Sequence, residues 1–295
     1  MSEDVVLVVG DVMTDIIVVP EGTLVRGSDR RARIRMVHGG SAANQAVWLA
    51  QFGVGTRFAA RVGSADKPAL DAYFGNRGIE PRLVGDPVLP SGILINIVDP
   101  DGERSFLTDR GANLALSPDD LPERLLEGAS WLVLSGYSFF AEGPRVAVIA
   151  LMAAARRRGC RIAVDPASEG FLREAGIRNF LDWTAGADVL FANYDEAFAL
   201  SGVADVGEQT RVLAETYRRV VIKRGALGAS IGNRDGVAAS VGAAQIEVVD
   251  TTGAGDAFLA GFLAAELRGE GESTCLAAAI EAGGRAVSRI GAQPG

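Results

Sequence analysis

Short runs of apolar, mostly β-branched residues alternate along this chain with longer stretches in which apolar positions recur at helical spacing. Each short run predicts a strand buried on both faces, and each longer stretch predicts a helix. The predicted strands are Val5–Val9, Trp131–Leu134, Arg161–Val164, Val189–Ala192 and Val220–Lys223, and the predicted helices are Ala42–Phe52, Arg145–Arg158 and Ala257–Leu267. Such alternation is typical of an α/β fold in which helices cover a mostly parallel sheet.

A further helix start is indicated by Ser117, Pro118, Asp119 and Asp120. Serine caps the first backbone N–H groups, proline fits the first helical position, and acids in the first turn interact favourably with the helix dipole. We therefore expect a helix to begin here and the alternation to resume.

Two segments interrupt the alternation, one from about Ile16 to Val37 and one from about Ser91 to Asp109. Both favour strands without an intervening helix, and the second predicts a hairpin that turns at the Asp-Pro-Asp-Gly sequence of residues 99–102. No internal repeat, low-complexity tract or linker is evident in the sequence. We therefore expect one domain, residues 1–295, into which residues 16–37 and 91–109 insert a small separate sheet.

Composition narrows the class of protein. The 295 residues are 48% hydrophobic and 22% charged, which suits a single domain with a substantial core. The net charge is −8, whereas a nucleic-acid-binding face needs a clustered excess of Lys and Arg. Cys160 and Cys275 lack the spacing of a disulfide framework or a zinc site, and neither a membrane span nor a signal peptide is evident. We expect a cytoplasmic protein that binds no nucleic acid and no membrane.

The sequence DTTGAGDAF, residues 250–258, is a glycine-rich loop with an acid near each end. Ile246–Val249 predicts a strand before it, and the helix predicted over Ala257–Leu267 follows it. A strand-to-helix junction presents backbone N–H groups that have no partner within the helix, and the helix dipole adds partial positive charge. The loop is therefore a candidate anion-binding site.

Gly253, Ala254 and Gly255 carry no bulk that would keep a phosphate away from those N–H groups. Asp256 follows in the first helical turn, where a carboxylate stays ionised and can accept a proton from a bound hydroxyl. The same residues also fit a plainer alternative, in which Asp256 caps the helix and the glycines form a tight turn. Two other phosphate-binding motifs, GxxxxGK[ST] and GxGxxG, do not occur.

DTTGAGDAF is similar to the C-terminal signature of the ribokinase-like, or PfkB, carbohydrate kinases. Further motifs of that family follow one another in order, so the resemblance spans nearly the whole chain. They are GDVMTD (Gly10–Asp15), HGGSAANQAVWLAQFG (His38–Gly53), DRGANLALSP (Asp109–Pro118), VDP (Val164–Pro166), the NxxE box (Asn193–Glu196), KRGALG (Lys223–Gly228) and RIGAQPG (Arg289–Gly295).

The resemblance implies a three-layer, ribokinase-like α/β fold with a small β lid formed by the two inserted segments. It implies ATP-dependent phosphorylation of a hydroxyl on a sugar or sugar acid, with Asp256 as the general base and Gly253, Ala254 and Gly255 as the anion hole. The lid would close over the substrate and exclude water. Exposed strand edges favour pairing between subunits, so a homodimer through the lid is a further expectation.

ATP and magnesium (Mg2+) are the implied cofactors. Asn193 and Glu196 match the NxxE box, which is associated with the magnesium ion and the phosphates, often through water. An exposed helix start over Glu196–Leu200 is the plainer alternative. Asp250 and Thr252 resemble members of a loop that binds a monovalent cation, potassium (K+), in some relatives; the alternative is that Asp250 serves only loop amides.

The other implied contacts divide between nucleotide and substrate. Gly225 is expected to act through close backbone approach, whereas Lys223 and Arg224 also fit solvated cations. His38, the single histidine, fits a structural role beside a Gly-Gly turn. The implied nucleotide-side residues are Lys223, Gly225 and Gly228, and the implied substrate-side residues are Asp11, Asp15, Gly39, Gly40, Asn44 and Arg110, with Asn113 near the last of these.

The identity of the acceptor stays open at the level of sequence. Ribose-specific relatives tend to carry lysine after the double glycine, where this chain has Ser41, and the GGSAAN sequence also occurs in nucleoside kinases of the family. Arg110 resembles a residue of relatives that act on sugar acids. Aromatic residues make up only 6% of the chain, which gives no clear platform for stacking a base. We expect a sugar or sugar acid; the alternatives are a nucleoside kinase and a catalytically inactive ligand-binding relative.

Overall fold

The computed structural model describes residues 4–98 and 104–294. Among these residues the main sheet has nine strands in the order β13-β12-β11-β10-β9-β8-β1-β4-β5. The strands from β11 to β5 in this order are parallel, and β12 and β13 add antiparallel pairs at one edge. They are β1 (Val5–Val9), β4 (Gly55–Gly63), β5 (Ile79–Asp86), β8 (Ala129–Ser135), β9 (Arg161–Asp165), β10 (Val189–Asn193), β11 (Arg219–Lys223), β12 (Ala229–Asn233) and β13 (Gly236–Val241).

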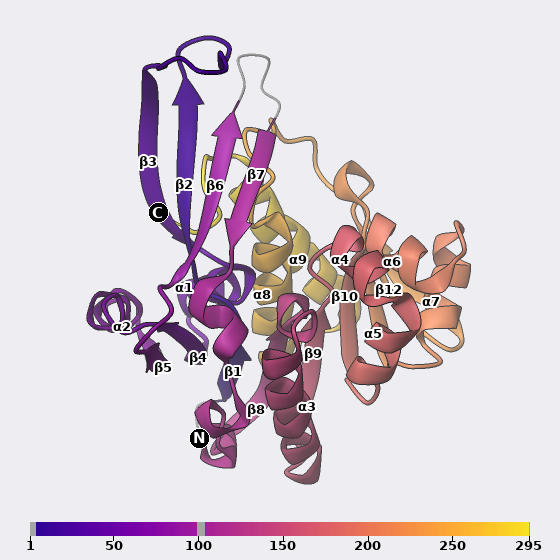
Figure 1. Cartoon of the computed structure of the whole chain (residues 1–295). Helices are drawn as coiled ribbons and strands as arrows, with labels where there is room; N and C mark the ends of the chain where they lie inside the picture. The colour runs from indigo at the N-terminus through magenta and orange to yellow at the C-terminus, as the bar shows by residue number, and fades with distance from the viewer. Residues whose placement is uncertain (1–3, 99–103, 295) are drawn as a thin grey trace.

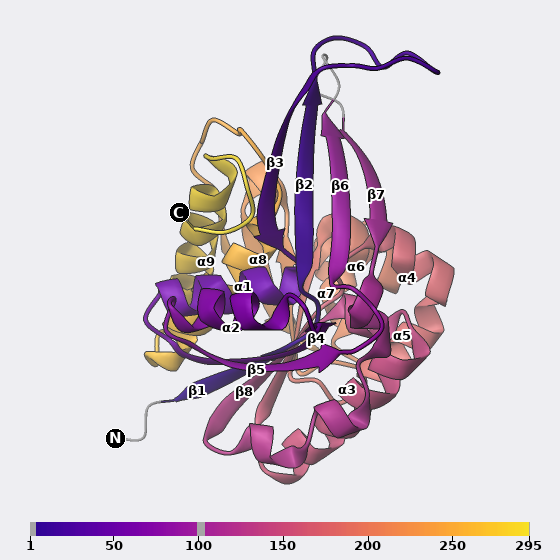
Figure 2. The same ribbon diagram turned by 60° about the vertical axis from the view of Figure 1, so that its left-hand side comes forward.

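Helices cover both faces of this sheet, which gives three layers (Figures 1 and 2). Side chains alternate along each strand, so Val6 and Val8 pack into one buried layer and Leu7 and Val9 into the other. The first layer is closed by α1 (Ser41–Gln51), α2 (Lys67–Gly75), α8 (Ala254–Leu267) and α9 (Glu272–Val287). The second is closed by α3 (Glu142–Arg157), α4 (Glu169–Ala175), α5 (Ile177–Thr184), α6 (Tyr194–Ser201) and α7 (Val206–Leu213).

The strands and helices predicted from the alternation are all present, with ends that differ by at most three residues. A mostly parallel sheet flanked by helices, with a second small sheet beside it, is thus confirmed. Parallel strands end at a common edge, so the residues that follow β1, β9, β10 and β11 are brought together there.

The helix expected at Ser117 is wrong in extent. Ser117 and Asp120 do form a reciprocal capping box, with the Ser117 N–H donating to the Asp120 carboxylate at 2.9 Å. The helix that they cap is a single 3₁₀ turn, Pro118–Asp120. Pro122 explains the stop, because the residue before a proline is driven out of the helical region, and Leu121 has φ −118° and ψ 55°.

The strand expected over Ile246–Val249 is also wrong. Residues 242–249 form a loop, and within the described chain no strand pairs with them. The β-branched residues of this segment suggested a strand, but Val248 is 61% exposed and the segment is not paired in a sheet of the described chain. The loop instead runs past the end of α9, where the Val249 N–H donates to the Val287 carbonyl oxygen at 2.8 Å.

The two inserted segments form a four-stranded sheet in the order β3-β2-β6-β7, which stands above the main sheet in both views (Figures 1 and 2). The strands are β2 (Met13–Pro20), β3 (Ala32–Gly39), β6 (Gly92–Val98) and β7 (Arg104–Asp109). The hairpin turn expected at residues 99–102 lies outside the described residues. One face of this small sheet points toward the carboxyl edge of the main sheet, where it helps to line a cavity.

Two expectations from composition can be compared with the described residues. Cys160 and Cys275 are buried and unbonded to each other, as the lack of a disulfide pattern indicates. None of the described helices has the length and apolar character needed to cross a membrane.

Candidate active site

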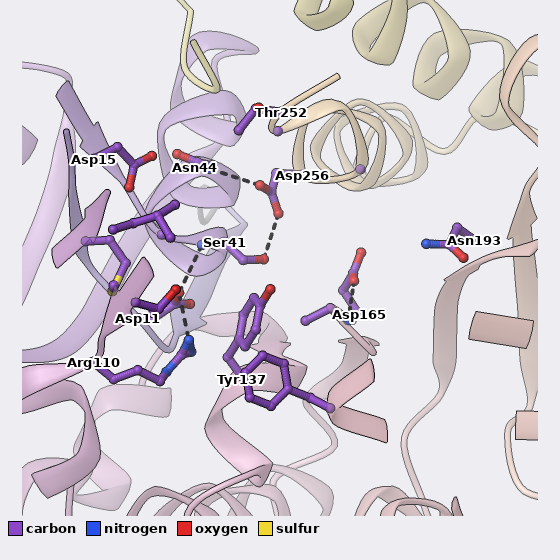
Figure 3. A pocket seen from close by; sticks show the side chains of 18 of the residues that line it. Asp11, Asp15, Ser41, Asn44, Arg110, Tyr137, Asp165, Asn193, Thr252 and Asp256 are labelled. Carbon is purple, nitrogen blue, oxygen red and sulfur yellow. Dashed lines mark hydrogen bonds and ion pairs between the residues drawn. The ribbon is translucent and has the colours of Figure 1, made fainter. Parts of the chain in front are cut away.

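A cavity of about 330 Å³ lies between the small sheet and the carboxyl edge of the main sheet (Figure 3). It contains most of the residues that the sequence indicated: Asp11, Asp15, Gly40, Asn44, Arg110, Asn193, Glu196, Lys223, Thr252, Gly253, Gly255 and Asp256. It also contains Ser41, which the sequence analysis noted only for the identity of the acceptor, and residues that the sequence did not single out: Met13, Leu94, Thr108, Tyr137, Asp165, Ala167 and Phe171. The site is therefore assembled from segments distributed over most of the chain.

Asp256 is the third residue of α8 and is held by side chains from α1. Its carboxylate accepts hydrogen bonds from the Ser41 hydroxyl at 2.7 Å, from the Asn44 amide at 3.0 Å and from the Gln45 amide at 3.1 Å. Figure 3 shows the carboxylate between Asn44 and Ser41. The residue that caps α8 is Gly253, so the plainer alternative of Asp256 as a simple helix cap does not describe its contacts.

Burial raises the pKa of Asp256 to about 7, and the nearby Asp165 carboxylate acts in the same direction. The hydrogen bonds from Asn44 and Ser41 oppose this shift, because they favour the ionised form. A carboxylate with a pKa near the working pH is well matched to accepting a proton from a hydroxyl.

The loop before Asp256 has the geometry expected of an anion site. Gly253 has φ +74°, and a Cβ there would lie 2.6 Å from the Ala292 carbonyl oxygen, so glycine is required. Helix geometry leaves the N–H groups of Gly255 and Asp256 without an acceptor inside α8. The Ala254 N–H donates to the Thr251 carbonyl oxygen at 3.3 Å and Ala254 is absent from the cavity lining, so its place in the expected anion hole stays a prediction. A Cβ at Gly255 would approach Lys223 Nζ to 3.1 Å, so bulk at this position would disturb the lysine.

Lys223 at the end of β11 donates to Asp165 at the end of β9 at 2.8 Å. Burial alone would lower the pKa of Lys223, but the Asp165 and Glu196 carboxylates outweigh burial and raise it. Lys223 is therefore a paired, charged residue of the cavity, and the expectation that it fits a merely solvated cation is wrong.

The NxxE box is a reciprocal capping box at the start of α6. The Glu196 carboxylate accepts the Asn193 N–H at 2.7 Å, and the Asn193 side chain accepts the Glu196 N–H at 2.8 Å. Asn193, Tyr194 and Asp195 are exposed at this helix start, as the plainer alternative expected, but the Glu196 side chain is buried and only 2% exposed. Burial raises the pKa of Glu196 to about 7, although the Lys223 ammonium lowers it.

Gly225 and Gly228 lie outside the lining of the cavity. Gly228 has φ +85°, and a Cβ there would lie 1.9 Å from the Val241 carbonyl oxygen, so its own turn requires glycine. Gly225 has φ +56° and open space where a Cβ would be. Their contact with a nucleotide stays a prediction.

Asp250 organises the loop that precedes α8. Its carboxylate accepts the N–H and the hydroxyl of Thr252 at 2.9 and 2.6 Å, and the N–H of Gly291 at 3.1 Å. These bonds match the alternative in which Asp250 serves loop amides.

The part of the cavity under the small sheet presents Asp15 (Figure 3). Asp15 is 8% exposed, and its Oδ1 atom has no hydrogen-bond partner among the described residues. Burial raises its pKa to about 7, with a further contribution from Asp11. Gly39 lies against the Asp15 carboxylate, and a Cβ at Gly39 would be only 2.2 Å from Asp15 Oδ2. The next residue, Gly40, has φ +98°, a conformation that favours glycine.

Asp11 and Arg110 border the same part of the cavity. Asp11 accepts the N–H groups of Ser41 and Ala42, both at 3.2 Å, and thereby holds the start of α1. The Arg110 guanidinium lies 3.8 Å from Asp11 and 4.2 Å over the ring of Tyr137. This cation is thus fixed by stacking and by a long ion pair, so its N–H groups remain available to a ligand.

Two residues near the motifs have structural roles. Asn113 donates to the Val12 carbonyl oxygen and accepts the Val12 N–H, both at 2.9 Å, so the expectation that it reaches the substrate is wrong. The ring of His38 packs on Tyr73 with centroids 4.1 Å apart, and His38 is absent from the cavity lining.

Several residues of the site escaped the sequence analysis. Ser41 lies three residues before Asn44 and four before Gln45 on α1, and this helical spacing could have grouped the three side chains around one partner. Asp165 ends a strand within a motif that was noted, and Ala167 beside it has φ +73°, uncommon for a residue other than glycine. Tyr137 and Phe171 both line the cavity with ring centroids 5.7 Å apart, but their planes are at 80° and Arg110 lies over Tyr137, so the expectation of no clear platform for stacking a base stays a prediction.

Known proteins resemble this chain over most of its length. The model of the pfkB family of carbohydrate kinases matches residues 4–295. An ATP-dependent ribose-1-phosphate kinase from Halopiger xanaduensis is 31% identical over 88% of this chain and 83% of its own. An aminoimidazole riboside kinase from Salmonella typhimurium is 30% identical over 76% of this chain and 72% of its own. The structure of an Arabidopsis thaliana ribokinase complexed with ribose and ATP is 25% identical and covers 99% of this chain and 95% of that one, with a TM-score of 0.81.

Proposed function

The chain belongs to the pfkB family of carbohydrate kinases and is an ATP-dependent carbohydrate kinase, and from this premise we propose that Asp256 is its general base and that a sugar or sugar-acid hydroxyl is the acceptor. One observation carries the proposal. Asp256 is a buried carboxylate at the N-terminus of α8, held by Ser41, Asn44 and Gln45, with a pKa raised to about 7.

In the proposed reaction Asp256 accepts the proton of the acceptor hydroxyl while the hydroxyl oxygen attacks the γ-phosphorus of ATP and ADP leaves. The N–H groups of Gly255 and Asp256, with the helix dipole, stabilise the charge on the transferring oxygens. Lys223, kept protonated by Asp165 and Glu196, adds positive charge on the nucleotide side. Ser41 and Asn44 hold the base in its reactive orientation.

The residues of the nucleotide side fit a magnesium ion held mainly by phosphates. Asp165 and Glu196 are buried acids with one lysine beside them, so this part of the cavity is short of positive charge. Among residues 4–98 and 104–294 no three potential ligands cluster into a metal site. One or two carboxylates with phosphates and waters are what Mg2+ ordinarily uses. When bound, Mg2+ would neutralise charge on the phosphates, and Glu196 and Asp165 would face it.

Potassium stays a prediction for the loop of Asp250 and Thr252. A monovalent cation there would order the loop before α8, a task that the Asp250 hydrogen bonds already serve in part. Turnover measured with potassium and with sodium decides the matter: a requirement for potassium supports a cation in this loop, and equal rates count against it.

Arg110 favours an acidic group on the acceptor. It is a cation in the part of the cavity under the small sheet, and its stacking on Tyr137 leaves N–H groups for a carboxylate or phosphate. The relative from Halopiger xanaduensis is named for a sugar phosphate. A nucleoside is the second candidate, because Tyr137 and Phe171 offer aromatic surface and the Salmonella relative is named for a riboside.

We also propose that the small sheet is a lid and that its outer face pairs with a second copy of the chain. Side chains on the face opposite Asp15 are apolar and exposed, including Met36 at 68%, Ile34 at 62% and Leu107 at 58%. An uncovered apolar sheet face of this kind favours burial between subunits. Sedimentation of the wild type and of Met36→Lys tests this: a dimer that dissociates in the variant supports it, and a wild-type monomer contradicts it.

The experiment that tests the kinase proposal is ATP consumption with a panel of pentoses, hexoses, sugar acids, sugar phosphates and nucleosides. Wild type and Asp256→Asn are compared in the presence of magnesium. Stimulation of the wild type by one acceptor, with loss of turnover in Asp256→Asn, is the expected result. Wild-type turnover that survives in Asp256→Asn would show that another group is the base. A lack of turnover with every acceptor, together with stabilisation by a panel member, would favour the inactive ligand-binding alternative.

A further inference from the structure

A second polar cluster lies at the opposite ends of the elements that carry the charges of the cavity. Glu266, near the C-terminal end of α8, accepts hydrogen bonds from Arg161 at 2.9 Å and from Arg219 at 2.7 Å. Arg161 is the first residue of β9, and Arg219 is the first residue of β11. These three residues are called the Glu266 triad below.

The cavity ends of the same three elements carry Asp165, Lys223 and Asp256. Asp165 is the last residue of β9 and Lys223 is the last residue of β11, and the two form an ion pair at 2.8 Å. Asp256 lies in the first turn of α8. Strand β10 separates β9 from β11, so both polar clusters bridge across it, one at each end.

Both clusters lie on the face of the sheet that α8 covers. β9 and β11 are each five residues long, and side chains alternate along a strand, so the first, third and fifth residues share a face. The third residues, Ala163 and Val221, belong to the buried layer that contains α8. The arginines at one end and the charged residues of the cavity at the other therefore point toward the same helix.

Between the two clusters the contact of α8 with the sheet is apolar. Leu259, Phe262 and Leu263 of α8 belong to the same buried layer as Ala163 and Val221, and Phe262 packs against Phe191 of β10 with ring centroids 5.2 Å apart. Apolar contact is non-directional, so it does not fix one position of α8 along its axis relative to the sheet. Hydrogen bonds require a defined distance and angle and therefore can fix that position. In some proteins, such as coiled coils, a buried polar contact specifies register although it adds little stability.

We propose that Glu266 is a positioning residue for phosphoryl transfer, which fixes the axial position of α8 against β9 and β11 and thereby the place of Asp256 and Gly255 beside Lys223. This inference rests on the proposed role of Asp256. There is little space between the start of α8 and Lys223, since a Cβ at Gly255 would lie 3.1 Å from Lys223 Nζ. A misplacement of about 1 Å in an active site can lower the rate by about 10²-fold.

The surroundings of the triad support positioning over stability. The Glu266 side chain is 12% exposed, and its Oε2 atom has no partner among the described residues, which is an unfavourable arrangement for stability alone. The Arg161 guanidinium lies 4.3 Å over the ring of Trp131 in β8, which holds it in place. A cavity of about 330 Å³, lined by the triad and by Asp188, Arg218 and Glu272, adjoins it. Water can reach the arginines there, so they need not destabilise a variant that lacks Glu266.

The test compares Glu266→Leu and Glu266→Gln with the wild type. Leucine removes both hydrogen bonds, whereas the glutamine amide oxygen can still accept them. We expect kcat to fall at least ~10-fold in Glu266→Leu and less in Glu266→Gln, with KM for ATP and for the acceptor within about 3-fold of wild type. Amide hydrogen exchange of residues 250–258, measured without substrates, should be several-fold faster in Glu266→Leu.

Glu123 supplies a matched control. Like Glu266, it is a glutamate paired with two arginines, Arg157 and Arg158, but it lies in the 3₁₀ turn Glu123–Leu126 and its side chain is 53% exposed. Glu123→Leu should leave kcat and the exchange of residues 250–258 unchanged.

The results separate this inference from the proposed function. Wild-type exchange rates at residues 250–258 in a folded Glu266→Leu variant would overturn the positioning role, as would a loss of kcat that only follows the loss of folded protein. If the wild type phosphorylates no acceptor, the proposed function fails, and hydrogen exchange still decides whether Glu266 holds the loop and α8 in place.

Discussion

Asp256 and Asp15 are two buried carboxylates of one cavity that differ in their partners. Both are 8% exposed, and burial raises the pKa of each to about 7. Asp256 accepts hydrogen bonds from three side chains of α1, whereas Asp15 Oδ1 has no partner among the described residues. The two carboxylates therefore have a similar pKa, although hydrogen bonds hold Asp256 in place and one oxygen of Asp15 has no hydrogen bond within the described part of the chain.

The difference distinguishes a carboxylate whose hydrogen-bond donors come from the protein from one whose donors would have to come from a ligand. Around Asp256 the fold supplies the donors, so the proposed base is in place before a substrate arrives. Around Asp15 the buried oxygen lacks a donor, and an unsatisfied group of this kind is expensive unless a ligand hydroxyl satisfies it. Asp15 should accordingly contribute to acceptor binding, and Asp256 to the chemical step.

The largest expected effect is that of Asp256→Asn. Asparagine cannot accept the proton, so kcat should fall by at least ~10²-fold and up to ~10⁴-fold, while KM for the acceptor changes little. Steady-state kinetics with the acceptor identified in the panel gives both constants. A variant that keeps more than a tenth of the wild-type kcat would remove Asp256 from the role of base.

Asp15→Asn should have a smaller effect of a different kind. A hydrogen bond to a charged group contributes about 1.5–3 kcal/mol, so KM for the acceptor should rise by roughly 10- to 100-fold. KM for ATP should stay within about 2-fold, because Asp15 belongs to β2 of the small sheet, whereas the proposed nucleotide-side residues Asn193 and Lys223 end strands of the main sheet. An unchanged acceptor KM would break the comparison on which this account rests.

Ser41→Ala should lower kcat by only several-fold, because Asn44 and Gln45 still hold Asp256. The Ser41 hydrogen bond lowers the pKa of Asp256, so its loss should raise that pKa and make the defect larger at pH 6 than at pH 8. The ratio of mutant to wild-type kcat across this range is the measurement. Ser41→Thr, which keeps the hydroxyl, is the control, and a ratio independent of pH would contradict the prediction.

The smallest effect is expected in stability. Asp15, Glu196 and Asp256 have folded-state pKa values raised to about 7, so between about pH 4 and 7 the folded protein binds more protons than the unfolded chain. Stability should therefore fall as pH rises through this window. The lowered pKa values of His38 and Glu80 act in the opposite direction, and the lowered pKa of Asp86, about 2, acts mainly below this window.

Thermal unfolding at pH 5 and at pH 8 tests this linkage. We expect the wild type to melt at least a few degrees lower at pH 8, and Asp256→Asn to show a smaller decrease. Equal decreases in the two proteins would mean that ionisation of Asp256 does not oppose folding.

The fold class could be predicted from local signals in the sequence, whereas the proposed role of Asp256 as base was implied by a family resemblance that a contiguous motif carries. Period-two and helical patterns indicate elements directly, and the glycine loop with its following acid is contiguous. The strand expected over Ile246–Val249 was wrong because β propensity does not reveal whether a partner strand is available. The helix at Ser117 was wrong in extent because a proline four residues beyond the first one ended it.

The partners of Asp256 could not be predicted in the same way. Ser41 and Gln45 lie more than two hundred residues away in sequence, and their contact with Asp256 depends on how α1 packs against α8. Asp165 and Lys223 could have been grouped, because the ends of parallel strands share an edge. The missing donor at Asp15 is invisible in sequence, since it concerns which neighbours are absent.

The most direct test of the division between the two carboxylates is equilibrium binding of the acceptor by calorimetry to Asp256→Asn and Asp15→Asn. The account predicts that Asp256→Asn binds the acceptor within about 3-fold of wild type, whereas Asp15→Asn binds at least ~10-fold more weakly. If Asp256→Asn lost acceptor binding while Asp15→Asn retained it, the assignment of chemistry to one carboxylate and recognition to the other would be contradicted.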